Sequence, residues 1–193
     1  MQQNYVNIIN QVIEEYPIDT SRIYGISLAR GSQSMWATAL ANPDLFAAMI
    51  CTSHEFYDTY GEELAAQKAQ ELFDLMPIWM FAGYLDDSGN GAKGIRLAQI
   101  AEELNAGGAN ITVGYGEDGE LMWNGLLRGE EAEALAENQI ALANESGSDD
   151  LMTFYMPGTL PQSMHWCWNA TYSNAGVRNW LFEQVNDTAY MPE

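Results

Sequence analysis

The chain has 193 residues, 47% of them hydrophobic and 18% charged, which suits one domain with a substantial buried core. Seven lysines and arginines stand against 27 aspartates and glutamates, and the net charge of −20 argues against binding to nucleic acid or to an anionic membrane surface. No apolar run approaches the roughly 20 residues that a membrane-spanning helix needs.

The first residues, Met1 to Tyr5, lack a basic region followed by an apolar stretch, so no signal peptide is visible. The acidic composition fits a secreted or salt-tolerant protein, and we expect an extracellular or cell-surface location. Cys51 and Cys167 form neither a disulfide framework nor a zinc motif, which leaves two buried thiols, slightly favoured, or one long-range disulfide. With two histidines and no Cys/His cluster, we expect no metal and no cofactor.

Helical and strand-like patterns alternate along the chain. Apolar residues at helical spacing predict a first helix over 5–16, which Pro17 ends. Several later segments are continuous apolar runs of the kind that is buried on both faces of a parallel sheet. Strands are expected over 22–26, 46–51, 77–82, 111–115 and 151–156. Further helices are expected over 32–41, 62–75, 92–104, 130–143 and 175–184.

This alternation predicts an α/β fold built on a parallel sheet, with residues 1–193 forming one domain. The acidic, glycine-containing stretch 116–150 precedes the last strand and is interpreted as a lid or insertion, or equally as a solvated surface excursion. A flavodoxin-like domain is an alternative within this class, but no phosphate-cradling glycine-rich loop of the usual form is present.

The most informative segment is Arg22-Ile-Tyr-Gly-Ile-Ser-Leu-Ala-Arg-Gly31. A strand that runs through a tight turn into a helix is the context of the nucleophile elbow, usually Gly-x-Ser-x-Gly. Ser27 and Gly31 occupy the flanking positions, where small residues are expected because backbone and helix approach closely, and Ala29 stands at the centre. In a rival register Ser27 is the nucleophile, and a third interpretation makes Ser27 only a small residue in the turn.

The same segment carries a resemblance to a known family. Arg22-Ile-Tyr24 is followed, at the matching distance, by Asn42-Pro-Asp-Leu-Phe-Ala-Ala48. The chain resembles the α/β-hydrolase esterases related to polyhydroxyalkanoate depolymerases and feruloyl esterases, whose elbow reads Arg-Ile-Tyr-x-x-Gly-x-Ser-x-Gly-Gly. It departs from that pattern at Ser27, usually glycine, and at Ala29, usually the nucleophilic serine. The spacing to Asn42–Ala48 favours the register centred on Ala29.

Two later segments extend the resemblance. Gly83-Tyr-Leu-Asp86 follows an apolar strand, where the family has Gly-x-x-Asp, although this carboxylate could also cap the next helix. His165 lies in a loop rich in glycine and proline, ahead of a helix with Trp-Leu-Phe182, as the family's catalytic histidine does. The order elbow, aspartate, histidine matches the hydrolase order. The resemblance implies that Asp86 and His165 belong to a catalytic triad and that the Arg30 backbone N–H contributes to the oxyanion hole.

His54 and several tryptophans are weaker candidates for the site. His54 follows the strand after the elbow, so it is expected near the same sheet edge, as a substrate-pocket residue or as a polar loop residue. Trp166, together with Trp123 and Trp168, is interpreted either as the lining of an apolar or sugar-binding cleft or as part of the core.

The resemblance implies a serine hydrolase that acts on carboxylic esters, with a peptidase as an alternative. Alanine has no hydroxyl, so covalent catalysis through position 29 is impossible in this chain. Ala29 is therefore interpreted as a change made to remove activity or as the mark of a natural pseudoenzyme that binds esters or glycans. The partner expected in either case is a small-molecule or polymeric ester.

α/β-Hydrolases carry several strands and the second oxyanion donor ahead of the elbow. Here the sequence offers one helix before it, so the first strand is expected to expose a pairing edge. We expect a truncated or processed chain, an N-terminal half supplied by another polypeptide, or a homo-oligomer.

Overall fold

A computed structural model describes residues 2–88, 92–114 and 122–192. Its five strands form one sheet in the order β1-β2-β3-β5-β4, and all neighbouring strands are parallel. The strands are β1 (Tyr24–Leu28), β2 (Ala48–Thr52), β3 (Ile78–Gly83), β4 (Ile111–Gly114) and β5 (Asp150–Tyr155). The predicted parallel α/β fold is confirmed.

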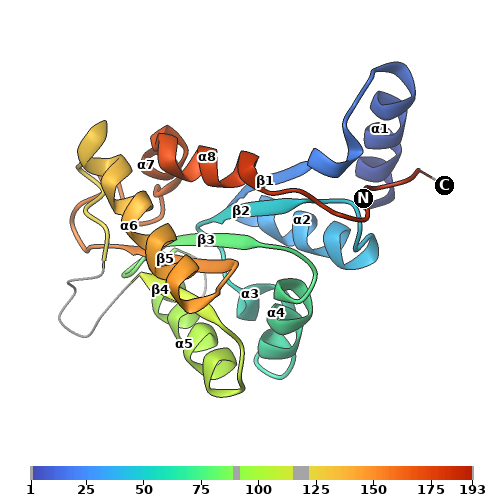
Figure 1. Cartoon of the computed structure of the whole chain (residues 1–193). Coiled ribbons are helices and arrows are strands. Elements are labelled where there is room, and N and C mark those ends of the chain that lie inside the picture. The colour runs from blue at the N-terminus through green and yellow to red at the C-terminus, as the bar shows by residue number, and fades with distance from the viewer. Residues whose placement is uncertain (1, 89–91, 115–121, 193) are drawn as a thin grey trace.

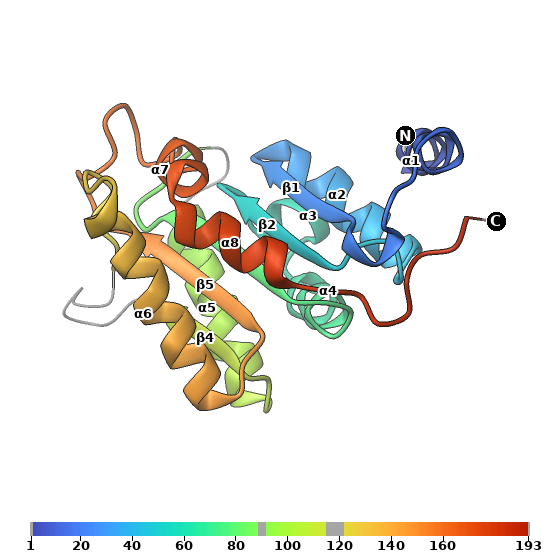
Figure 2. The same ribbon diagram turned by 45° about the horizontal axis from the view of Figure 1, so that its top comes forward.

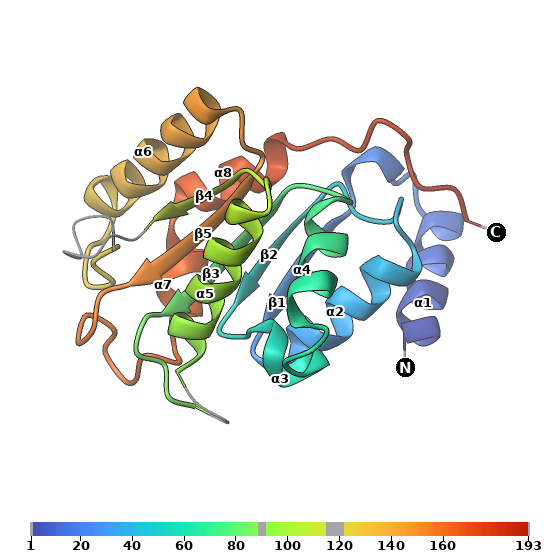
Figure 3. The same ribbon diagram turned by 90° about the horizontal axis from the view of Figure 1, so that it is seen from below.

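Helices cover both faces of this sheet (Figures 1 and 3). One face is covered by α2 (Arg30–Ala41), α3 (Phe56–Tyr60), α4 (Ala65–Phe73) and α5 (Lys93–Ala106), and the other by α6 (Glu130–Ser146), α7 (Trp168–Ser173) and α8 (Ala175–Glu183). The first helix, α1 (Gln2–Glu15), packs beside α2. The two faces have separate hydrophobic cores, with Trp36, Met49 and Leu72 in the first and Trp79, Phe81 and Leu181 in the second.

Most predicted elements lie within about two residues of their observed bounds, but two short helices, α3 and α7, were missed. The carboxylate of Glu55 caps α3 by accepting hydrogen bonds from the backbone N–H groups of Tyr57 and Asp58. A helix of five residues is too short for apolar periodicity to reveal it. The helix predicted over 62–75 begins in the structure only at Ala65, after α3 has ended.

The stretch 116–150 lies partly outside the described residues, because nothing before Met122 in it is described. Its described part contains α6, which connects β4 to β5 and is built into the fold. Gln139 of α6 is buried, donates to the carbonyl oxygen of Met152 and accepts from Thr153. A role of this stretch as a lid stays a prediction.

Cys51 and Cys167 are both free and buried, as the favoured interpretation of the sequence held. None of the helices among the described residues is both long enough and apolar enough to cross a membrane.

Strand β1 lies at the edge of the sheet, and its second face is covered only at its start, where Tyr24 packs edge-on against Phe182 of α8. Gly25 and Ser27 point to the α2 side and are buried, whereas Ile26 and Leu28 are 49% and 45% exposed on the other face. Figure 2 shows α8 passing over the neighbouring strands and leaving the end of β1 clear. Among the described residues no strand pairs with the outer edge of β1.

Candidate active site

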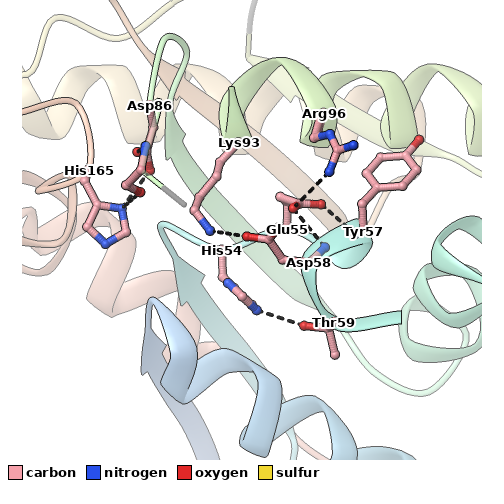
Figure 4. A network of polar contacts seen from close by, with 10 residues as sticks. His54, Glu55, Tyr57, Asp58, Thr59, Asp86, Lys93, Arg96 and His165 are labelled. Carbon is pink, nitrogen blue, oxygen red and sulfur yellow. Dashed lines mark hydrogen bonds and ion pairs between the residues drawn. The ribbon is translucent and has the colours of Figure 1, made fainter. Parts of the chain in front are cut away.

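The sequence candidates gather at one edge of the sheet. Ala29 follows β1, His54 follows β2, Asp86 follows β3, and His165 lies in the loop after β5. Because the strands are parallel, their carboxyl ends meet at this edge, which is where open α/β sheets bind ligands. Figure 4 shows His54, Asp86 and His165 from close by.

Ala29 occupies the sharp bend between β1 and α2. Its backbone has φ 45° and ψ −129°, a conformation that costs a non-glycine residue about 1–3 kcal/mol. Two hydrogen bonds hold the bend: the Ala29 N–H donates to the Thr52 carbonyl oxygen at 2.8 Å, and the Ser32 N–H donates to the Ala29 carbonyl oxygen at 3.0 Å. A strained strand-to-helix turn, the geometry expected of a nucleophile elbow, is thus centred on residue 29.

The rival register finds no support in this geometry. Ser27 lies inside β1, two residues before the bend, and its buried hydroxyl shares a hydrogen bond of 2.9 Å with that of Ser32. One reason given for the motif is also wrong for this chain. A Cβ added to Gly31 would meet no described atom within 4 Å, so crowding within the described part of the chain does not require glycine there.

Asp86 and His165 form a hydrogen-bonded pair. His165 Nδ1 lies 2.8 Å from Asp86 Oδ2, and the Ser88 hydroxyl lies 2.7 Å from the same nitrogen. Asp86 is fully buried. Burial alone would raise the pKa of Asp86, but hydrogen bonds from His165 and Ser88 outweigh it and leave the pKa below its usual value. Asp86 is not the side-chain cap of α5, whose N-cap residue is Ala92.

Close packing against β3 places His165. A Cβ at Gly83 would overlap the carbonyl oxygen of Met164, the residue before His165. From the other side, the Ser53 hydroxyl donates to the His165 carbonyl oxygen at 2.6 Å. Glycine in the sequence Gly-x-x-Asp therefore lets the histidine loop rest directly on the strand that carries the aspartate.

A cavity of about 370 Å³ connects these groups. Ala29 and His165 both line it, while Asp86 lies behind His165 and is not part of its wall. The complete lining is Ala29, Arg30, Gln33, His54, Asp58, Ser88, Lys93 and His165. Arg30 is the first residue of α2, so its backbone N–H has no partner within the helix.

His54 is a neutral, buried member of this cavity wall. Its side chain stacks on Trp36, and its Nε2 lies 2.8 Å from the Thr59 hydroxyl. Its other ring nitrogen, Nδ1, is buried without a hydrogen-bond partner among the described residues. Burial, and secondarily the charge of Lys93, lowers the pKa of His54 to about 4.

Sequence reasoning missed four polar residues of the cavity lining, which are Gln33, Asp58, Ser88 and Lys93. The Lys93 ammonium lies 2.6 Å from a carboxylate oxygen of Asp58, and both side chains are largely buried. Ser88 bonds to His165. Lys93 and Asp58 are 35 residues apart, and neither lies in a recognisable motif, so the local sequence does not indicate that they form an ion pair.

The tryptophans lie outside the cavity lining. Trp166 is 40% exposed and stacks on Trp168, which meets the His165 ring edge-on at 5.4 Å between centroids. Trp123 is a core residue that packs edge-on against Trp79 and Phe81.

Comparison with solved structures identifies one similar protein, described as a thermostable esterase. The match has a TM-score of 0.58 and 23% sequence identity, and it covers 95% of this chain and 36% of the esterase chain. The chain has an esterase-like α/β fold. It spans little more than a third of that esterase's length, and at this identity the likeness establishes the fold alone. No protein-family model and no curated protein matches the sequence.

Gly83→Ala is expected to destabilise the protein by about 1–3 kcal/mol, because the added methyl group would displace the Met164 backbone. Urea unfolding measures this change. Gly31→Ala is the matched control, since its methyl group meets open space in the first turn of α2. Equal stability of the two variants would contradict the packing argument.

The His54 ring is expected to titrate near pH 4 in a proton NMR experiment, with His165→Asn used to assign the two histidines. The folded-state pKa lies below the unfolded value of about 6.5, so the unfolded chain binds the proton more readily between these values. The contribution of His54 to stability is therefore complete above pH 6.5 and is lost as the pH falls toward 4. A midpoint at 6.5 or higher would refute the buried, neutral assignment.

Proposed function

We propose that the chain carries the site of a serine-type carboxylic ester hydrolase, with Ala29 at the position of the nucleophile and Asp86 and His165 as the other two members of the triad. The observation that carries the proposal is the bend at Ala29, which shares a cavity with a histidine held by a buried carboxylate. The esterase-like fold and the order of the three residues along the chain support it.

In such a site a hydroxyl at residue 29 attacks the ester carbonyl. The His165 Nδ1–H is committed to Asp86, which leaves Nε2 to take the proton of the hydroxyl and return it to the leaving alcohol. The backbone N–H of Arg30, at the start of α2, donates to the oxyanion. The family that the sequence resembles adds the finer proposal that the natural substrates belong to the polyester or feruloyl ester class.

With alanine at position 29 the chain itself binds without cleaving. Removal of a serine nucleophile costs about 10⁶ in turnover in a well-studied serine protease. A binding module for esters is the second candidate function, favoured by the alanine in this sequence.

We also propose that the outer edge of β1 pairs with an extended segment outside the described residues, for example one from another polypeptide or from a second copy of this chain. Beside this edge lies an apolar cavity of about 610 Å³, whose lining includes Ile9, Ile26, Leu28 and Phe46. The exposed Ile26 and Leu28 offer the apolar surface that a covering element buries.

Ala29→Ser is expected to turn the inert chain into an esterase, measured as hydrolysis of p-nitrophenyl acetate. Adding Asp86→Asn should lower the new activity about 10⁴-fold, because the imidazole loses the partner that fixes its tautomer. Ser27→Ala, combined with Ala29→Ser, should leave the rate unchanged. A folded Ala29→Ser protein that stays inert would favour the binding module.

The free edge of β1 is expected to show rapid amide hydrogen exchange at Ile26 and Leu28. The Ala29 N–H points to β2, so the N–H groups of these two residues, which alternate with it, point away from the sheet. NMR-detected exchange in dilute protein, with Ile50 of β2 as the protected reference, measures the difference. Strong protection of Ile26 and Leu28 would contradict an unoccupied edge.

A further inference from the structure

The cavity beside Ala29 differs in charge from the molecule around it. The whole chain has seven basic residues and a net charge of −20, yet two of the seven, Arg30 and Lys93, are among the eight residues that line this cavity. Asp58 is the one acidic residue in the lining. A wall with more cations than anions, in a strongly acidic protein, selects for a ligand group of negative charge.

Lys93 is held in place. Its side chain is 8% exposed, and the ion pair with Asp58 fixes the ammonium on the cavity wall (Figure 4). A buried lysine in this position pays little further conformational entropy when a ligand binds, since its rotamer is already restricted.

Among the described residues, Arg30 is the cavity cation that has no ion pair. Arg22, Lys68, Lys93 and Arg96 form ion pairs with carboxylates. The guanidinium groups of the remaining two, Arg128 and Arg178, bind backbone carbonyl oxygens. Arg30 has neither kind of contact with the described part of the chain, and its exposed side chain begins one residue after the bend. A guanidinium presents a planar pair of donors that matches a carboxylate.

His54 supplies a second, independent sign of a ligand. The side chain is 5% exposed and lines the cavity, and its Nδ1 lacks a hydrogen-bond partner within the described residues. Buried polar atoms are nearly always paired, so an orphaned nitrogen in a cavity wall marks a place for a polar ligand atom.

We propose that the cavity binds an ester that also bears a free carboxylate, such as the monoester of a short dicarboxylic acid. The carboxylate lies between Arg30 and Lys93, with His54 as a neutral polar neighbour, and the ester carbonyl lies between Ala29 and His165. The ester half of this statement rests on the proposed function, whereas the carboxylate half does not. The cavity volume of about 370 Å³ suits a small ligand of this kind.

The test uses the unmodified chain, which cannot hydrolyse its ligand, and measures binding by NMR titration of the His54 and His165 rings and by calorimetry. The probes are monoethyl succinate, diethyl succinate and succinate. Monoethyl succinate is expected to bind at least about tenfold more tightly than the neutral diester, since charge-assisted hydrogen bonds are roughly twice as strong as neutral ones.

Arg30→Gln is expected to lower the monoester affinity about tenfold and to weaken diester binding much less, because glutamine keeps the backbone N–H of residue 30 and removes only the charge. Arg22→Gln is the matched control, because Arg22 precedes the amino end of the same strand and pairs with Asp19 there. Lys93→Met combined with Asp58→Asn removes the buried pair without leaving one charge alone, and it should weaken monoester binding as well.

The outcomes separate the carboxylate part of the proposal from its ester part. Tighter binding of the monoester, lost in Arg30→Gln and kept in Arg22→Gln, supports both. Equal binding of monoester and diester, insensitive to Arg30→Gln, overturns the carboxylate site and leaves the esterase proposal standing. Binding of succinate and monoester with equal strength supports the carboxylate site and weakens the ester assignment. Absence of binding by all three probes overturns the inference.

Discussion

The hydrogen bond between His165 and the buried carboxylate of Asp86 joins two loops that are 79 residues apart in the chain. The arrangement of the candidate site depends on it. Asp86 is fixed by the end of β3 and by its bonds to Ser88, and the histidine loop can reach it because Gly83 leaves room for the Met164 backbone. Removing either condition would leave a buried carboxylate without its main partner, which is costly.

The bend at Ala29 is the second constraint. An alanine there is strained and forms no side-chain hydrogen bond that would offset the strain, so the surrounding structure must impose the bend. A backbone with positive φ is unfavourable for this residue, and it persists because β2 and the first turn of α2 fix both sides through Thr52 and Ser32. The fold thus maintains a strained bend at a residue that shares a cavity with His165, although the side chain there is a methyl group. Under the proposed function, such a scaffold binds an ester and lacks one functional group for its cleavage.

The sequence was sufficient for the parallel sheet, which follows from the apolar runs, and the segments that carry the family resemblance were sufficient to bring Ala29, Asp86 and His165 to one edge of it. It was insufficient wherever the signal is carried by contacts between distant segments. The Lys93–Asp58 pair, the bond from Ser88 to His165 and the orphaned Nδ1 of His54 arise only when three loops meet. The short helix α3 was missed because five residues are too few to show apolar periodicity. Its N-cap, Glu55, did not mark the start of a helix in the sequence either.

The most direct test of the central claim is labelling of Ala29→Ser with a fluorophosphonate, followed by peptide mass spectrometry. The reagent phosphonylates a serine hydroxyl that a neighbouring histidine activates. The account predicts one adduct, on residue 29, which disappears when His165→Gln is added. An adduct on Ser27, or labelling that does not depend on His165, would contradict it.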